Sequence, residues 1–124
     1  MSEVPPAPGV LTGKTVIVDD SPVLVCQLQC LLQALDFDAA HCAEPAQLAG
    51  QRPAYVFVEL LQLEHNGFCI LRMLRGTLDC PLILISGTGR PSDLHWGRQA
   101  GATHVLTRPL QLENIREVLH GHPG

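Results

Sequence analysis

Positive charge is scarce in this chain of 124 residues. Lys14 is the only lysine, seven arginines are the other cations, and twelve acidic residues leave a formal net charge of −4. Surfaces that bind nucleic acids or anionic membranes need a clear excess of cations. We therefore expect neither a nucleic acid nor a membrane among the partners.

Long apolar segments are absent as well. No run approaches the roughly 20 residues that cross a bilayer. The first residues also lack the basic-then-apolar layout of an export signal. Both absences favour a cytoplasmic protein.

The five cysteines are odd in number, and most of them lie within apolar runs: Cys26, Cys30, Cys42, Cys69 and Cys80. Without an export signal, we expect reduced thiols packed in the core rather than disulfides. Cys26 and Cys30 share one face of an expected helix. The alternative is therefore a metal pair that recruits His41 and Cys42.

Apolar residues make up 46% of the chain, which is enough for the core of one domain of ordinary size. Three prolines and a glycine lie within positions 5–9 and oppose regular structure there. We expect a disordered segment over 1–13, a single domain over 14–120 and a flexible tail over 121–124.

Short apolar runs alternate with helical segments along the chain, which predicts a parallel sheet with helices on both faces. Ser21 and Pro22 mark the first helix start, because serine caps a helix and proline suits its first position. The expected strands are 14–19, 39–42, 54–59, 81–86 and 103–107. The expected helices are 22–35, 44–48, 68–74, 92–100 and 111–119.

Polar residues stand where four of these strands end. Asp19 and Asp20 end the first strand, Glu59 the third and Ser86 the fourth, and Arg108 follows the fifth. Five strand–helix units are too few for a closed barrel and suit an open, doubly wound α/β sheet of the flavodoxin type. Its strand order would be 2-1-3-4-5, with the carboxyl ends converging on one crevice. The crevice should hold three acids, a hydroxyl and a guanidinium.

Several short motifs occur in a characteristic order and spacing: 16–21 (Val-Ile-Val-Asp-Asp-Ser), Asn66-Gly67, Ser86-Gly87, Gly101-Ala102 and Arg108-Pro109. On these motifs, residues 14–119 resemble a response-regulator receiver domain, the CheY-like module of two-component signalling. Residues 96–102 and 106–109 resemble more narrowly the receivers of the type IV pilus twitching system.

The resemblance implies a metal site and a phosphoacceptor in the crevice. In the family, two acids after the first strand help to bind Mg²⁺; here they are Asp19 and Asp20. An aspartate that accepts a phosphoryl group ends the third strand, at the position of Glu59. The metal also takes a backbone carbonyl two residues later, here that of Leu61.

Further roles are implied at the last two strands. A serine or threonine and a lysine contact the phosphoryl oxygens, at the positions of Ser86 and Arg108. An aromatic residue that changes rotamer on activation occupies the position of Val105. The chain thus departs from the family at the phosphoacceptor, the lysine and the aromatic switch, and Leu63 replaces a usual proline.

The substitutions at Glu59 and Arg108 have physical consequences that can be anticipated. Glutamate carries its carboxylate about 1.5 Å further than aspartate, and a misplacement of about 1 Å can cost roughly 10²-fold in rate. The planar fork of an arginine matches a carboxylate through two parallel hydrogen bonds, which a lysine cannot do. Glu59 and Arg108 are therefore expected to form an internal ion pair that imperfectly imitates the phosphorylated state.

We expect a degenerate receiver that acts as a phosphorylation-independent interaction module in bacterial two-component or phosphorelay signalling. It would have no catalytic residues and no required cofactor, and Mg²⁺ would bind weakly or not at all. Its partners would be other signalling proteins, and a homodimer would form through 92–100, 103–107 and 111–119, with Trp96 on that surface.

Three alternatives remain open. The chain could be an active receiver that still binds Mg²⁺ and accepts a phosphoryl group on Glu59 or another acid. The crevice could bind a nucleotide or another anion, although no Gly-x-Gly-x-x-Gly or P-loop pattern follows the first strand. Individual residues could also be structural, with Ser86 capping the next turn and Glu59 an inert relic.

Overall fold

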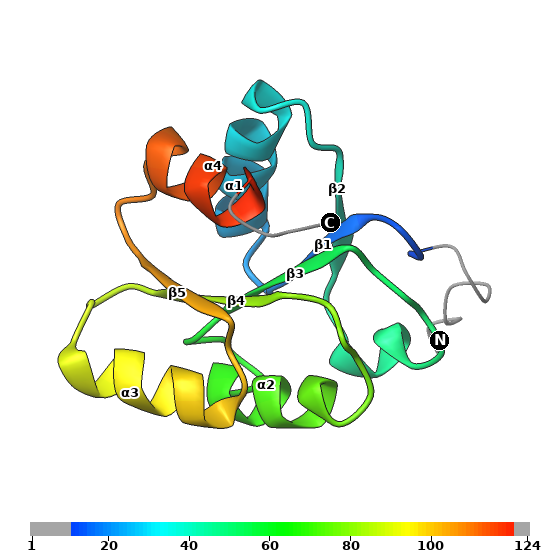
Figure 1. The fold of residues 1–124 in the computed structure, drawn as a ribbon, viewed down its shortest axis with the longest axis vertical. Coiled ribbons are helices and arrows are strands. Elements are labelled where there is room, and N and C mark those ends of the chain that lie inside the picture. The colour runs from blue at the N-terminus through cyan, green and yellow to red at the C-terminus, as the bar shows by residue number, and fades with distance from the viewer. Residues whose placement is uncertain (1–10, 121–124) are drawn as a thin grey trace.

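The computed structural model describes residues 11–120, in which five short strands form one parallel sheet. The strands are β1 (Thr15–Val18), β2 (Ala39–Cys42), β3 (Tyr55–Glu59), β4 (Leu82–Ser86) and β5 (His104–Thr107). Their order is β2-β1-β3-β4-β5, which confirms the predicted α/β fold and strand order (Figure 1). Because all neighbours are parallel, the carboxyl ends of the strands lie along one edge of the sheet.

Helices cover both faces of the sheet. They are α1 (Pro22–Ala34), α2 (Gly67–Arg75), α3 (Pro91–Ala100) and α4 (Leu112–His120), with a 3₁₀ helix η1 (Pro45–Leu48). Figure 1 shows α1 and α4 on one side of the sheet and α2 and α3 on the other. The segment 44–48, predicted as a short helix, is a single 3₁₀ piece that begins at Pro45 and ends at Leu48, because the backbone of Ala49 is already extended.

The core consists of two layers, one on each face of the sheet. Alternating strand residues such as Val16, Val56 and Leu84 pack toward α2 and α3, whereas Ile17 and Phe57 pack toward α1 and α4. A sheet buried on both faces needs apolar side chains at consecutive positions, which explains the uninterrupted apolar runs. None of the helices among residues 11–120 is long and apolar enough to cross a bilayer.

The ordered fold begins earlier than predicted. Leu11 is only 7% exposed, and its backbone N–H donates to Oε1 of Gln51 at 2.8 Å. Residues 11–13 therefore belong to the folded domain rather than to a disordered segment. The remainder of that segment, 1–10, and the tail 121–124 lie outside the described residues.

The prediction of core cysteines was wrong at three of the five positions. Cys26, Cys30 and Cys69 are exposed, Cys80 is half-buried, and Cys42 alone is buried; none of these five described cysteines forms a disulfide. The buried stripe of α1 consists of Val25, Leu28 and Leu32, so the two cysteines of this helix lie beside the stripe rather than in it.

Candidate functional site

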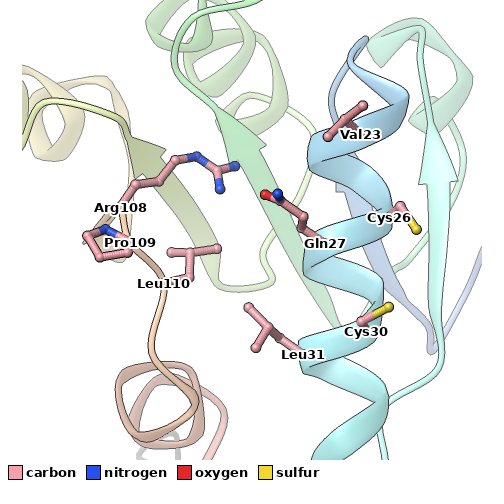
Figure 2. Close-up of a pocket in the computed structure, with 8 residues that line it drawn as sticks. All are labelled: Val23, Cys26, Gln27, Cys30, Leu31, Arg108, Pro109 and Leu110. Atoms are coloured by element: carbon pink, nitrogen blue, oxygen red, sulfur yellow. The ribbon is translucent and has the colours of Figure 1, made fainter.

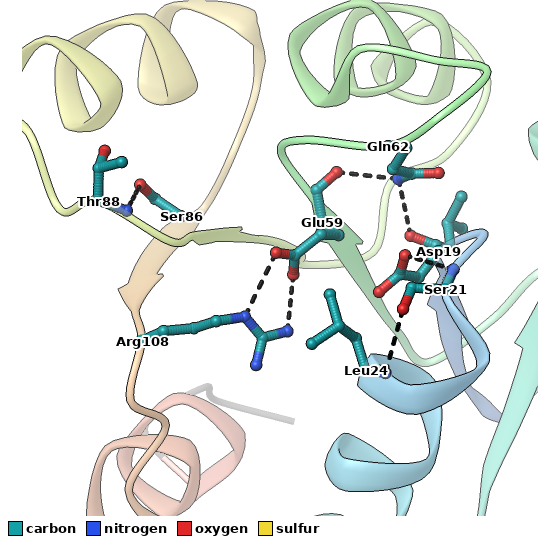
Figure 3. A network of polar contacts seen from close by, with 9 residues as sticks. Asp19, Ser21, Leu24, Glu59, Gln62, Ser86, Thr88 and Arg108 are labelled. Carbon is teal, nitrogen blue, oxygen red and sulfur yellow. Dashed lines mark hydrogen bonds and ion pairs between the residues drawn. The ribbon is translucent and has the colours of Figure 1, made fainter.

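Glu59 and Arg108 form a bidentate ion pair at the carboxyl edge of the sheet. Nε of Arg108 donates to Oε1 at 3.3 Å, and Nη2 donates to Oε2 at 2.9 Å (Figure 3). The Glu59 side chain is 7% exposed and that of Arg108 is 20% exposed. The pair expected from the sequence is therefore present, and it is largely withdrawn from water.

The backbone fixes both ends of this pair. The N–H of Arg108 donates to the carbonyl of Ser86 at 3.0 Å, which extends the β4–β5 ladder as far as the guanidinium-bearing residue. On the other side, α2 begins directly against the end of β3. A Cβ at Gly67 would lie 2.6 Å from Cα of Leu60 and 2.8 Å from the carbonyl oxygen of Glu59, so only glycine permits this approach.

Burial raises the pKa of the Glu59 carboxyl above its usual value, although the hydrogen bonds and charge of Arg108 oppose the rise. The pKa of Asp19 is also raised, first by burial and then by the neighbouring charge of Asp20. The charge of Asp19 also raises the pKa of Glu59, and Arg108 lowers the pKa of both acids. These three side chains therefore form one electrostatic cluster.

The first two acids are hydrogen-bonded to nearby backbone. Oδ1 of Asp19, a residue 2% exposed, accepts the N–H of Ser21 at 3.0 Å at the start of α1. Oδ2 of Asp20 accepts the N–H of Glu64 at 2.9 Å and so ties the β1–α1 loop to the β3–α2 loop. Both acids thus contribute to loop structure at the edge of the crevice.

In this arrangement Glu59 presents no carboxylate oxygen free of Arg108 to a magnesium ion of the kind the family binds. Mg²⁺ demands octahedral oxygen ligands at close range, whereas both carboxylate oxygens of Glu59 are taken by Arg108. Within residues 11–120, no three acidic, histidine or cysteine side chains are grouped so that they could hold a metal ion. This also applies to Cys26 and Cys30, which acquire no third ligand from His41 or Cys42.

Gln62 is a site residue that the sequence did not reveal. Its Nε2 donates to the carbonyl of Val18 at 3.0 Å and to that of Glu59 at 2.9 Å, which joins the ends of β1 and β3 (Figure 3). Its Oε1 is buried and has no hydrogen-bond partner among the described residues. The preceding Leu61, whose carbonyl was expected at the metal, has a side chain exposed at the surface.

Ser86 is directed away from the ion pair. Its hydroxyl donates to Oδ2 of Asp93 at 2.8 Å and accepts the N–H groups of Thr88 at 3.3 Å and Gly89 at 3.1 Å. Figure 3 shows the hydroxyl pointing toward the β4–α3 loop rather than toward Arg108. The interpretation of Ser86 as a cap of the following turn therefore describes this geometry.

Asp93, in the first turn of α3, was also missed. It accepts the hydroxyl of Thr88 at 2.6 Å as well as that of Ser86. These two hydrogen bonds, that of Thr88 first, lower the pKa of the Asp93 carboxyl. The one sequence signal was an acidic residue placed two positions after Pro91 at a helix start, where a carboxylate is favourable.

Val105, at the position of the family's aromatic switch, packs partly buried against the core layer beneath α3. A Cβ at Gly97 would lie 2.8 Å from Cδ2 of Leu84 and 3.1 Å from Cγ2 of Val105. Helix α3 therefore packs closely against Val105, whose side chain is smaller than the family's aromatic residue. Leu63, at the usual proline position, is 89% exposed.

The surface expected to mediate self-association is open to solvent. Trp96 is 51% exposed and lies edge-on against His95 with ring centroids 4.9 Å apart. On α4, Arg116 and Glu113 form an exposed ion pair at 3.7 Å. The surface therefore combines an aromatic side chain with paired charges.

No family model matches the sequence. Protein PilH of Pseudomonas aeruginosa is 27% identical over 115 residues, which cover 87% of this chain and 95% of PilH. The two-component response regulator ORR25 of Oryza sativa subsp. japonica is 26% identical over 111 residues, which cover 85% of this chain and 16% of ORR25. The chain therefore spans only about a sixth of the length of the rice regulators it matches.

Solved structures of receiver domains are similar to this structure over most of the chain. The receiver domain of the TMAO respiratory system response regulator TorR has a TM-score of 0.75 at 25% identity, covering 88% of this chain and 94% of that domain. The BeF₃-activated receiver domain of Klebsiella pneumoniae RstA has a TM-score of 0.78 at 19% identity, covering 89% and 97%. The second likeness concerns the fold alone.

Proposed function

We propose that this chain, which is a CheY-like receiver domain of the response-regulator type, is a degenerate receiver. It acts as a phosphorylation-independent interaction module in bacterial two-component or phosphorelay signalling. A receiver is a signalling module rather than a conventional enzyme, so the conformation it presents to other proteins carries its function.

One observation carries the proposal: both carboxylate oxygens of Glu59 are occupied by Arg108. A carboxylate must present a free oxygen to attack a phosphorus atom, and this one is held by a planar, permanently charged fork. A transferred phosphoryl group would have to displace this guanidinium from the carboxylate. The pair therefore imposes one fixed charge state, in which Glu59 carries a single charge rather than the nearly two of a phosphoryl group.

The metal-binding acids support the same proposal. Asp19 and Asp20 are retained, but their hydrogen bonds to Ser21 and Glu64 serve the loops. We propose that Mg²⁺ binds weakly or not at all, and that no cofactor is required. Phosphoryl transfer in receivers depends on that ion, so its weak binding would remove a second requirement of the reaction.

The Ser86–Asp93 contact bears on the output. In an active receiver the hydroxyl at this position turns toward the phosphoryl group, whereas here Asp93 retains it. The conformation of the β4–α3 loop is therefore stabilised by Asp93 and does not depend on Glu59. We propose that the protein presents one constant surface to its partners.

The partners we propose are other signalling proteins in the cytoplasm, with self-association through α3, β5 and α4 around Trp96. The pathway we favour is linked to type IV pili or motility, on the resemblance of residues 96–102 and 106–109 to twitching receivers. The sequence identity to PilH, 27%, is nearly the same as that to the rice regulator ORR25, 26%. The proposed link to pili therefore depends on those short segments.

An active receiver remains the second candidate, because Asp19 stays buried beside Glu59 and raises its pKa as a functional neighbour would. Nuclear magnetic resonance separates the two. Beryllofluoride with Mg²⁺ mimics an acyl phosphate and should leave the amide spectrum of the wild type unchanged. The variant Glu59→Asp with Arg108→Lys is the positive control, and its amides near 59, 86 and 105 should shift. Equivalent shifts in the wild type would establish the active receiver instead.

A further inference from the structure

An open groove of about 980 Å³ runs between α1 and the loop that follows β5. Its walls are largely apolar. Val23, Gln27 and Leu31 line it from the helix, and Arg108, Pro109 and Leu110 line it from the loop (Figure 2). The volume lies at the upper end of the range, about 300–1,000 Å³, that small-molecule sites occupy.

The charge around the groove favours a neutral occupant. Helix α1 contains no charged residue over its whole length, and Arg108 is the only charged residue that lines the groove. Its charge is balanced by Glu59 at 2.9 Å. Asp19, which also interacts with Arg108, adds further negative charge nearby. An anionic ligand would therefore gain little attraction and would meet repulsion.

One end of the groove nevertheless offers hydrogen-bond donors. A guanidinium carries five N–H bonds, and the pair with Glu59 uses those on Nε and Nη2. No hydrogen bond involves Nη1 in the part of the chain that the structure describes. Figure 2 shows the amide of Gln27 pointing toward the Arg108 guanidinium across this end, while Leu31 and Leu110 lie further along.

The geometry points to a binding site in this groove for a small, neutral, mainly apolar molecule that carries a carbonyl oxygen. The oxygen accepts hydrogen bonds from Nη1 of Arg108 and from the amide of Gln27. The apolar body lies along Leu31 and Leu110. The inference goes beyond the proposed function and does not depend on it, since the donors exist whether or not Glu59 can be phosphorylated. A bound ligand would touch Arg108 and so couple the groove to the crevice.

The neutral dye Nile red, which carries one aromatic carbonyl, is a direct probe. We expect saturable fluorescence enhancement with wild-type protein and binding about fivefold or more weaker with Gln27→Glu, because the new carboxylate would take Nη1 and add negative charge. Gln33→Glu is the matched control, since Gln33 is exposed on the same helix and does not line the groove. It should bind as the wild type does. Absence of saturable binding, or equal weakening in both variants, would overturn the site.

Cysteine alkylation locates the bound probe. Cys26 and Cys30 line the groove, whereas Cys69 is exposed on α2 and provides the internal reference. Saturating Nile red should slow alkylation of the groove pair at least twofold relative to Cys69, read by peptide mass spectrometry. Equal rates with and without the dye would contradict binding in the groove. Protection that grows with protein concentration alone would assign the groove to a second copy of the chain and would also overturn the inference.

Discussion

The hydroxyl of Ser86, at the end of β4, donates to the carboxylate of Asp93, in the first turn of α3, across 2.8 Å. Two consecutive elements are thus joined by side chains as well as by the loop between them. Thr88 donates to the same carboxylate oxygen from within that loop. The carboxylate of Asp93 therefore organises the segment that a phosphorylated receiver would be expected to move.

Asp93→Ala should lower the free energy of unfolding by about 1 kcal/mol, because two hydrogen bonds to a partly exposed charged group are lost. The lowered pKa of Asp93 means that this stabilisation is present above the usual aspartate pKa of 3.8 and is lost as pH falls through the folded value. The difference in unfolding free energy between variant and wild type, measured by urea denaturation, should therefore become smaller at acidic pH. Asp38→Ala, at an exposed position, is the control. A gap that widens toward low pH would contradict the assignment.

Glu59 and Arg108 should behave as a unit in a double-mutant cycle. Arg108→Ala leaves two buried acids without their cation and should cost about 2–3 kcal/mol, whereas Glu59→Ala removes one acid and should cost about 1–2 kcal/mol. We expect a coupling energy of about 1 kcal/mol. The exposed pair Arg116–Glu113 is the control and should show coupling near zero. Additive effects at the crevice would mean that Glu59 is an inert relic.

The raised pKa of Asp19 predicts a particular pH dependence. Burial makes the folded protein hold the proton more tightly than the unfolded chain, so stability falls as pH rises from the usual value of 3.8 to the folded value. Asp19→Asn retains the acceptor for Ser21 and removes the charge. The variant should gain stability relative to the wild type as the pH rises from about 4 toward about 7. A difference that is constant across this range would show that Asp19 is not perturbed. Asp38→Asn provides the comparison.

Gln62→Ala should destabilise the protein by about 1–2 kcal/mol, because the carbonyls of Val18 and Glu59 lose their shared donor. Hydrogen exchange should speed up in the β3–α2 loop ahead of the rest of the fold. Gln33→Ala, at an exposed position on α1, should leave both quantities unchanged. Unaltered exchange in the loop would mean that Gln62 does not hold the two strands together.

The centre of the sheet was predictable because β1, β3 and β4 are buried on both faces. Runs such as Val16-Ile17-Val18 must be apolar at every position, and a polar residue then marks the strand end. Helix α1 was harder for the opposite reason. It has no charged residue to mark its solvent face, so Cys26 and Cys30 could not be distinguished from the buried stripe.

Within the site, only the ion pair was predictable, because the charges and lengths of its two side chains match. A glutamate and an arginine at the ends of β3 and β5 meet because the strand order places those ends near one another. The contacts of Gln62 and Asp93 depend on how two loops fold back, and no periodic pattern encodes that. The direction of the Ser86 hydroxyl was equally hidden, since it depends on the position of α3.

The most direct test of the central claim is the intact mass of the protein after incubation with acetyl phosphate and Mg²⁺. The wild type should keep its mass, because Arg108 hydrogen-bonds both oxygens of Glu59 and no three acids within residues 11–120 are grouped to hold a metal ion. Glu59→Asp combined with Arg108→Lys serves as the positive control and should acquire one phosphoryl group. A stoichiometric gain of one phosphoryl group by the wild type would contradict the account and identify an active receiver.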